Sequence, residues 1–390
     1  MYLGIDGLPL TAAKTGVGHY TSELAIALAN LAASNQIEIV YPSTYPTIAH
    51  AEQKSAPLPS NLKLKRVAVG TLGKHWWSIG LPRYARRNKL ELFHGTNYDI
   101  PLWRRCATVL TIHDLSQLLH AETHEKRSVR RARRRLPHMA RLADAIITPT
   151  ECVRNDVRRL LGVVPEKIFA IPEAARTCFR PLVFEETAVT RSRLGIGDNF
   201  LLSVGTLEPR KNLSVLVNAF AEVTSARSQS STQLVIAGGR GWLSGPLFDA
   251  IEKSPVRDRI VLTDYLHDDE LRALYSGCRA FVYPSIHEGF GLPPMEAMAC
   301  GAPVVASRIP ALEETTGGAA LLFDPGSVHE LTRSVLEVLD NENKRRELSA
   351  AGLRRAADFT WKKTAEATLS VYEEALRRFQ KVGAGASPPS

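Results

Sequence analysis

The chain lacks any long apolar run, and its first residues lack the pattern of a signal peptide. No stretch of its 390 residues reaches the roughly 18 apolar residues that a membrane-spanning helix needs. The N-terminus starts with the strand-like residues Tyr2–Asp6 and has neither the basic nor the apolar region of a signal peptide. These absences predict a cytoplasmic protein. Any membrane attachment would then be peripheral, at the inner face of the membrane.

Paired cysteines and a common metal motif are also absent. The five cysteines lie far apart in the sequence and never form a Cys-x-x-Cys pair, which argues against a structural zinc site and a disulfide framework. No Asp-x-Asp sequence occurs either. The sequence therefore predicts no metal site and no cofactor. The cysteines are Cys106, Cys152, Cys178, Cys278 and Cys300.

Acidic residues are missing from one strongly basic segment, Lys126–Arg141. The basic residues also concentrate in one half of the chain: residues 1–180 hold 26 Lys and Arg against 14 Asp and Glu, or +12, and residues 181–390 hold 23 against 26, or −3. This asymmetry predicts an acidic partner for the first half, such as an anionic membrane surface, a pyrophosphate-linked acceptor or nucleic acid.

Within this segment, apolar residues recur at helical spacing opposite the basic ones. One interpretation is an ordinary solvated helix face. The other is a surface for anionic lipid, with Arg130, Arg131, Arg134 and Arg135 as its contacts. Nucleic acid is disfavoured because no aromatic residues are interleaved with the basic ones. Pro137 is expected to kink or split the helix.

The length and pattern of the chain predict two domains of parallel α/β structure. A single core stops growing at about 250–300 residues. Apolar strand-like runs alternate with helical stretches such as 16–32, which is typical of parallel sheets covered by helices. The predicted strands are 2–6, 37–41, 90–94, 108–112 and 145–148 in the first half, and 200–204, 233–237, 260–262, 280–284, 303–306 and 320–323 in the second.

The most informative run is Ser285–Val305, in which Glu288 and Glu296 frame a glycine loop and a helix start. Gly289 and Gly291 allow backbone geometry that other residues resist, and the two prolines that follow suit a first helical turn. The free N–H groups of Phe290, Gly291 and Leu292 would then form an anion site of the kind that phosphates occupy. Two glutamates beside a phosphate would repel it unless they bind hydroxyls, and a nucleotide sugar has both groups. The alternative is a loop with two solvated glutamates.

This run resembles the signature of the retaining nucleotide-sugar glycosyltransferases of family 4, which have the GT-B fold. In that family a glutamate, seven residues and a second glutamate stand in a His-Glu-Gly-Phe-Gly-Leu-Pro context, and His287–Pro293 matches it. The context of Gly205–Asn212 and of the His113-Asp114-Leu115 motif most resembles bacterial polysaccharide mannosyltransferases. The resemblance implies two Rossmann-like domains that face a central cleft.

The expected boundaries follow from this architecture. An acceptor-side domain is expected over 1–175, together with a crossover helix over 361–382 that returns to it. A nucleotide-sugar-binding domain is expected over 176–360, and 383–390 should be a disordered tail. After Pro172, where the family usually has Asn-Gly-Val-Asp, this chain departs from the pattern, and no catalytic role is assigned to that segment.

The resemblance also implies roles for individual residues. Glu288 would hold hydroxyls of the transferred sugar, Glu296 the ribose diol, and Arg210 and Lys211 the diphosphate. These two cations follow a predicted strand, where the alternative is a solvated loop pair. His113, which on its own could equally be a core histidine, would contact the transferred sugar. The remaining donor-binding candidates are Gly16, Val17 and Gly18 near the diphosphate and sugar, Gly205 in the loop before Arg210, Tyr265 and Leu266 beside the base, and Gly289, Phe290, Gly291 and Leu292 in the glycine loop.

The sequence therefore predicts a metal-independent, retaining glycosyltransferase. It would move a hexose, with mannose from GDP-mannose as the first candidate, to a hydroxyl of a glycan or lipid-linked glycan. Two other classes stay open at this point. A GT-B sugar-nucleotide epimerase would isomerise the donor without an acceptor, and a nucleic-acid-binding protein would use the basic segment but leave the glutamate loop unexplained.

Overall fold

The computed structural model describes residues 1–12, 15–48, 57–70, 75–227 and 231–384. Contacts divide the chain into two compact units. Unit 1 contains Met1–Leu115, Ala132–Glu173 and the chain from Thr360 onward, and unit 2 contains Ser116–Arg131 and Ala174–Phe359. The segment Ser116–Arg131 thus groups with unit 2, although the expected first domain included it. Of the expected tail, residues 383 and 384 belong to the last helix, and 385–390 lie outside the described residues.

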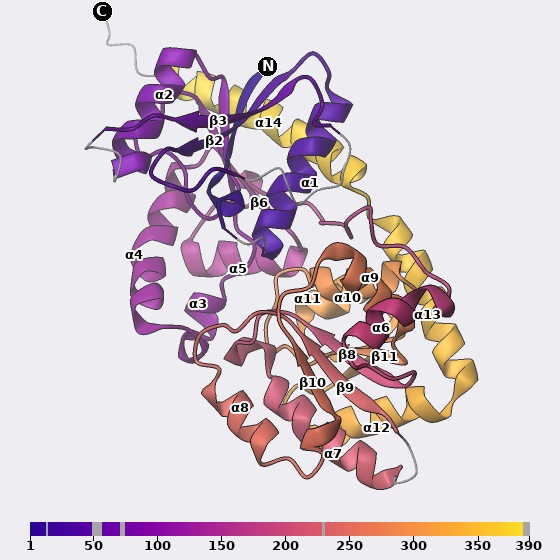
Figure 1. The fold of residues 1–390 in the computed structure, drawn as a ribbon. Helices are drawn as coiled ribbons and strands as arrows, with labels where there is room; N and C mark the ends of the chain where they lie inside the picture. The colour runs from indigo at the N-terminus through magenta and orange to yellow at the C-terminus, as the bar shows by residue number, and fades with distance from the viewer. Residues whose placement is uncertain (13–14, 49–56, 71–74, 228–230, 385–390) are drawn as a thin grey trace, which may run out of the picture. The chain divides into compact units, whose positions relative to one another are not determined.

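Unit 1 is built on a seven-stranded parallel sheet in the order β3-β2-β1-β4-β5-β6-β7 (Figure 1). The strands are β1 Tyr2–Asp6, β2 Gln36–Pro42, β3 Leu62–Val67, β4 Leu92–Gly95, β5 Ala107–Thr111, β6 Ala145–Thr148 and β7 Ile168–Ala170. All five strands predicted for this half are present, shifted by at most two residues at an end. The prediction missed β3, whose outer positions are lysines, and β7, which has only three residues.

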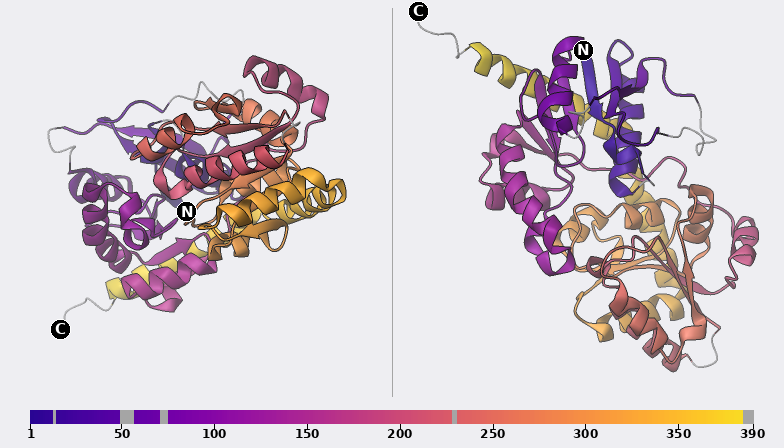
Figure 2. Two further views of the ribbon diagram at one scale, coloured as in Figure 1. Left: turned by 90° about the horizontal axis from the view of Figure 1, so that it is seen from below. Right: turned by 60° about the vertical axis from the view of Figure 1, so that its left-hand side comes forward.

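Helices cover both faces of this sheet. On one face α14 packs against α1, β5 and β6, and two views show α14 running beside α1 (Figures 1 and 2). On the other face α2 and a preceding π-helical turn pack over Phe93 and Val40. The expected crossover helix is therefore present. The helices of unit 1 are α1 Gly16–Leu31, α2 Leu81–Asn88, α5 Glu151–Leu161 and α14 Trp361–Ala384, and α4 Lys126–Leu142 runs on from unit 2 into unit 1.

The basic helix α4 is continuous through Pro137, so the expected split does not occur. Its predicted apolar stripe is the buried face, formed by Val129, Ala132, Leu136, Met139 and Ala140. The opposite face is exposed and carries Lys126, Arg127, Arg130, Arg131, Arg133, Arg134 and Arg141. Arg135 differs from these residues because it is only partly exposed and its Nε pairs with the carboxylate of Asp99.

Unit 2 is built on a six-stranded parallel sheet in the order β10-β9-β8-β11-β12-β13, which is the Rossmann order. All six predicted strands are present. They are β8 Phe200–Val204, β9 Gln233–Ala237, β10 Ile260–Thr263, β11 Ala280–Tyr283, β12 Val304–Ser307 and β13 Ala320–Phe323. The helices are α3 Ser116–Leu119, α6 Ala188–Arg193, α7 Leu213–Ala226, α8 Gly245–Glu252, α9 Asp268–Gly277, α10 Leu292–Ala299, α11 Pro310–Thr316, α12 Val328–Asp340 and α13 Glu342–Asp358.

Successive strand residues of unit 2 point to opposite faces of the sheet and into two separate cores. Phe200 and Leu202 of β8 join the core that α9, α10 and α11 cover. Leu201, between them, joins the core that α7, α8 and α12 cover. This alternation buries both faces, so the strands are almost uniformly apolar, as expected for parallel sheets. The carboxyl ends of the strands are left as the edge where polar loops can gather.

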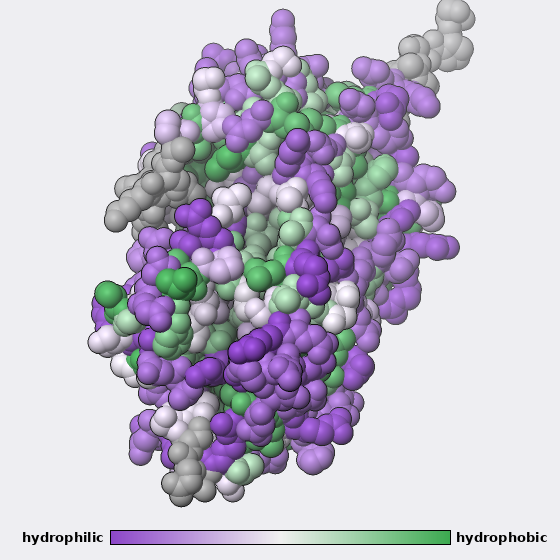
Figure 3. Space-filling model, turned by 90° about the vertical axis from the view of Figure 1, so that its right-hand side faces the viewer, coloured by the Kyte–Doolittle hydropathy of each residue, from purple (hydrophilic) through white to green (hydrophobic). Residues whose placement is uncertain are grey.

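The face drawn in Figure 3 is mostly hydrophilic, with apolar residues in small groups. Over the described residues, no helix is both long and apolar enough to cross a membrane.

One buried carboxyl in unit 1 should make stability depend on pH. Asp6, at the end of β1, is 1% exposed, and its Oδ1 accepts a hydrogen bond from the Leu8 amide at 3.1 Å. Burial raises the pKa of Asp6 to about 7, and the nearby Asp99 adds to that rise. The pKa of Asp6 is higher in the folded state than in the unfolded state. Its contribution to the stability of the fold is therefore fully present below about pH 4. This contribution is lost as pH rises through 7.

We expect Asp6→Asn to remove this loss of stability at higher pH. Relative to wild type, the free energy of unfolding of the variant should increase by roughly 2–3 kcal/mol between pH 5 and pH 8, at about 1.4 kcal/mol per pKa unit. Chemical denaturation at the two pH values measures it. Asp249→Asn, which removes a carboxylate from an exposed position, is the control. Parallel pH dependence of wild type and Asp6→Asn would contradict the assignment.

Candidate active site

Two neighbouring strands of unit 2 bring the predicted site residues together. β8 and β11 pair in parallel at the point where the strand order reverses, so their carboxyl ends lie side by side. The loop after β8 carries Arg210 and Lys211, and the loop after β11 carries Glu288. In open α/β sheets this reversal point is where ligands bind. The topology thus explains how residues nearly 80 positions apart share one site.

Glu288 is held by one oxygen of its carboxylate. The side chain is nearly buried, with the residue 8% exposed. Four donors converge on Oε1 alone: Lys211 Nζ at 2.6 Å, Ser285 Oγ at 2.6 Å, Tyr283 OH at 2.9 Å and Arg210 Nη1 at 2.9 Å. Oε2 receives no hydrogen bond from the described parts of the chain, and it is not among the fully buried unpartnered atoms. The carboxylate is therefore fixed at one oxygen and able to accept hydrogen bonds from a ligand at the other.

The charges around Glu288 keep it ionised. Burial alone would raise the pKa of Glu288, but Arg210 and Lys211 outweigh burial and hold that pKa far below its usual range. Burial lowers the pKa of Lys211, and Glu288 opposes that effect. Arg210 also pairs with Glu208, from Nη2 to Oε1 at 2.5 Å. The two cations and two carboxylates sum to zero, so neither cation is an unshared positive charge.

The start of α10 has the geometry of an anion site. Gly291 has φ +92°, and a Cβ there would stand 2.6 Å from Leu312 Cδ2, so only glycine fits. Within the described residues, the amides of Phe290, Gly291 and Leu292 donate no hydrogen bond. The Phe290 ring is buried and packs against Phe359 with ring centroids 5.7 Å apart. Phe290 therefore offers a ligand its backbone and not its ring.

Glu296 lies further along α10 and is 5% exposed. Its Oε1 accepts a hydrogen bond from Arg176 Nε at 2.8 Å, and its Oε2 accepts one from Tyr275 OH at 3.3 Å. Burial raises the pKa of Glu296, and Arg176 opposes this rise. The two glutamates of the motif are thus held in different ways.

The other donor-side predictions in unit 2 fall at strand ends. Gly205, directly after β8, has φ +151°, and a Cβ there would lie 3.4 Å from Lys211 Cε. The backbone conformation, rather than crowding by the lysine, is what favours glycine at this position. Tyr265 follows β10 and is 46% exposed. Leu266 is packed in the core, so its side chain is not available to a nucleotide base and only its backbone is.

The remaining predicted residues belong to unit 1. His113 follows β5; its Nδ1 lies 3.0 Å from Glu173 Oε1 and its Nε2 lies 2.9 Å from the carbonyl oxygen of Thr96. Both nitrogens face acceptors, which suits the doubly protonated ring. Burial lowers the pKa of His113, but the hydrogen bond and charge of Glu173 outweigh it, so the net pKa is raised. Gly16, Val17 and Gly18 form the first turn of α1.

Sequence reasoning missed several side chains that organise the site. Tyr283 and Ser285 flank the end of β11 and supply two of the four donors to Glu288. Glu208 sits in the loop that was singled out for its cations. The sequence did offer a signal for two of these side chains. Ser285 is a hydroxyl just after a buried strand, and Glu208 is an acid close to the cation pair. Arg176 gave no such signal, because its partner Glu296 is 120 residues away.

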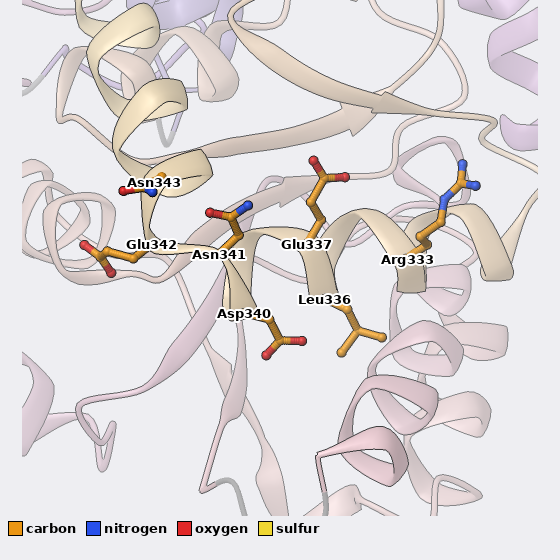
Figure 4. Close-up of a pocket in the computed structure, with 7 residues that line it drawn as sticks. All are labelled: Arg333, Leu336, Glu337, Asp340, Asn341, Glu342 and Asn343. Carbon is orange, nitrogen blue, oxygen red and sulfur yellow. The ribbon is translucent and has the colours of Figure 1, made fainter.

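A surface pocket elsewhere in unit 2 is not part of this site. It lies at the junction of α12 and α13, where Glu337, Asp340 and Glu342 line it (Figure 4). Because α12 follows β13 and runs back antiparallel to it, the end of α12 lies at the amino edge of the sheet. The Glu288 loop lies at the carboxyl edge.

Comparison with known protein families matches the two halves of the chain to two different family models. The model described as "Glycosyltransferase Family 4" matches residues 14–177, and that of "Glycosyl transferases group 1" matches residues 186–355.

Two relatives of the chain are named as mannosyltransferases. The "O-antigen chain mannosyltransferase B" of Escherichia coli is 28% identical over 379 residues, which cover 94% of this chain and 97% of the relative. The "Serotype-specific mannosyltransferase WbdA" of Escherichia coli is 32% identical over 304 residues, or 75% of this chain and 37% of WbdA. This chain therefore matches little more than a third of WbdA.

Solved structures share the fold at low identity. The sucrose-phosphate synthase of Thermosynechococcus elongatus has a TM-score of 0.74 at 19% identity and 99% coverage of both chains. Anabaena HepE, solved in complex with UDP-glucose, has a TM-score of 0.73 at 16% identity, with 97% of this chain and 99% of HepE covered.

Two Rossmann-like units with these neighbours define the GT-B fold. The chain consists of a glycosyltransferase family 4 domain followed by a group 1 glycosyltransferase domain, and mannosyltransferases are among its relatives.

Removal of the Glu288 carboxylate should reduce sugar transfer while leaving the fold intact. We expect Glu288→Ala to lower turnover at least about tenfold, or 1.4 kcal/mol of barrier. Folding should survive because Arg210 keeps Glu208 as its partner and Lys211 can shed its proton. Steady-state transfer rates measure this effect, with circular dichroism as the check on folding.

Glu337→Ala is the matched control, since it removes an exposed glutamate from the α12–α13 pocket. Its turnover should equal that of wild type. Near-normal transfer by Glu288→Ala would rule out a role for Glu288 in the reaction.

Proposed function

We propose that this protein is a retaining, metal-independent glycosyltransferase that moves a hexose from a nucleoside diphosphate sugar to a hydroxyl of a glycan or lipid-linked glycan. Mannose from GDP-mannose is the first candidate donor. The observation that carries the proposal is the single-sided anchoring of Glu288, which keeps Oε1 saturated and Oε2 able to accept hydrogen bonds from sugar hydroxyls. The names of the two Escherichia coli relatives support mannose.

In this proposal the leaving diphosphate is stabilised without a metal. The amides of Phe290, Gly291 and Leu292 at the positive end of α10 donate hydrogen bonds to phosphate oxygens. Lys211 has an ammonium hydrogen beyond those directed at Glu288 and Tyr283, and can turn it to the diphosphate as negative charge develops. Arg210 lies beside it and supports the same charge. Attack would come from the face that the diphosphate leaves, so the product keeps the anomeric configuration of the donor.

The other site residues have supporting roles in the proposal. Tyr265, exposed after β10, would offer its ring to the nucleotide base, and Leu266 would offer its backbone. Gly205 belongs to the loop that carries Arg210 and Lys211. Glu296 would accept hydrogen bonds from the ribose hydroxyls. His113 would contact the transferred sugar, and the first turn of α1 would present its amides to the donor.

Donor choice and metal dependence can be tested together. Thermal-shift screening across nucleoside diphosphate sugars should show the largest rise in melting temperature with GDP-mannose, because a ligand that binds only the folded state raises its stability. Transfer from that donor to glycan and lipid-linked acceptors should persist in excess EDTA. NMR of the product should show the anomeric configuration of the donor.

Three results would contradict parts of this proposal separately. Activity that EDTA abolishes and Mg²⁺ or Mn²⁺ restores would refute metal independence. An inverted product would refute retention. Isomerisation of the donor in the absence of an acceptor would identify an epimerase instead.

We also propose that the exposed basic face of α4 binds an anionic membrane surface. Arg130, Arg133 and Arg134 lie three and four residues apart and so share one face of the helix. Arg135 is set aside because its Nε pairs with Asp99. Each basic residue near such a surface contributes about 1 kcal/mol, and salt screens the attraction because the Debye length is about 8 Å at physiological ionic strength.

Replacement of Arg130, Arg133 and Arg134 by glutamine should release the protein from anionic vesicles in a sedimentation assay. Binding of GDP-mannose should not change, since none of the three arginines is among the proposed donor-binding residues. A control variant with Arg180, Arg333 and Arg354 replaced by glutamine loses the same charge from exposed positions outside α4. If the two variants bind vesicles equally, and neither responds to salt, the basic face is an ordinary solvated one.

A further inference from the structure

Arg176 lies in the segment after Pro172, where the chain departs from the family pattern. Its side chain is buried in unit 2. Only 5% of the residue is exposed. Its Nε donates to Glu296 at 2.8 Å, its Nη1 pairs with Asp268 at 2.5 Å, and its guanidinium lies 4.5 Å from the centre of the Phe179 ring. A buried guanidinium with three such partners is held in one orientation. The Glu296 carboxylate that it binds is therefore also held in one orientation.

Glu296 is the group that this orientation controls. Burial works against its charge, and Arg176 is the strongest influence in the other direction. The guanidinium holds Oε1, whereas the Tyr275 hydroxyl approaches Oε2 at 3.3 Å, longer than the usual 2.7–2.8 Å for such bonds. Oε2 is thus the more weakly engaged oxygen. An ionised carboxylate held at one oxygen can accept hydrogen bonds from neighbouring hydroxyls at the other.

We propose that Arg176 is a positioning residue that orients Glu296 and places a positive charge beside it, and thereby gives the donor site its preference for a nucleotide with intact ribose hydroxyls. This inference rests on the proposed function, in which Glu296 accepts the ribose diol. Arg176 itself does not touch the nucleotide. Without it, Glu296 loses its fixed orientation and the positive charge beside it, so it discriminates poorly between ribose and a sugar that lacks the hydroxyls.

A purely structural role for Arg176 predicts something different. Loss of a structural ion pair would lower stability and weaken binding of every nucleotide by a similar factor. Loss of the positioning role weakens binding only of nucleotides that carry the hydroxyls. The informative quantity is therefore the ratio of the dissociation constants of dideoxy and normal nucleotides, not either constant alone.

Isothermal titration calorimetry of the full chain with GDP and 2′,3′-dideoxy-GDP, repeated with the UDP pair, measures that ratio. Wild type should bind the ribonucleotide at least about tenfold more tightly, which corresponds to 1.4 kcal/mol. In Arg176→Met the ratio should fall below about threefold at pH 7, with the dideoxy affinity unchanged within about twofold.

Arg191→Met is the matched control. Arg191 is 6% exposed, pairs with Asp198 at 2.5 Å and lies 4.3 Å from the centre of the Phe184 ring, so it repeats the surroundings of Arg176 in the same unit without a contact to the motif. In Arg191→Met, the ratio of the dissociation constants of dideoxy and normal nucleotides should match that of wild type. Arg176→Lys, which restores the charge, should recover part of the preference, and it takes the place of the methionine variant if circular dichroism shows that the latter does not fold.

Two outcomes overturn the inference, and they are distinguishable. If Arg176→Met keeps the wild-type ratio at pH 7, or loses affinity for both nucleotides equally, Arg176 has no positioning role and the proposed function stands. If wild type itself binds neither nucleotide pair, the proposed donor site is wrong and the inference fails with it.

Discussion

The pairing of β8 with β11 is the constraint on which the site depends. Because the two strands run parallel and adjacent at the reversal of strand order, their loops must emerge together at the carboxyl edge of the sheet. The close approach of Gly205 to Gly238 then shapes this edge, since a Cβ on Gly238 would meet the carbonyl oxygen of Gly205 at 2.1 Å. The cations of one loop reach the carboxylate of the other only because of this geometry.

The cluster at Glu288 shows why the charged residues come as a set. A carboxylate in this nearly closed environment is costly unless paired, and so is the Lys211 ammonium. Together with Arg210 and Glu208 they are neutral overall, which makes burial tolerable. The arrangement leaves one asymmetry, the engaged Oε1 and the open Oε2. That asymmetry, rather than net charge, is what the site can offer a ligand.

Much of the fold was predictable because its signals are local. Each strand of unit 2 is a short apolar run, and the glycines and prolines around Glu288 mark a loop and a helix start within a few residues. The structure bears out both. Side chains whose partners are distant in sequence were not predictable in this way. Arg176 meets Glu296 only after the chain folds, and Arg135 looked like its exposed neighbours until Asp99 proved to be its partner. Strand β3 was missed because its alternating lysines hide an edge strand.

The two glutamates of the motif illustrate how one short segment acquires two chemistries. Glu288 has two cations and two hydroxyl donors on one oxygen, so its ionisation is secure and the pKa lies far below the usual range. Glu296 has one cation and one distant hydroxyl, and burial leaves its pKa raised. The positive charge beside Glu296 comes from Arg176, a residue outside the motif. A family signature can specify both carboxylates, but the cation that pairs with the second stands at position 176, where this chain departs from the family pattern.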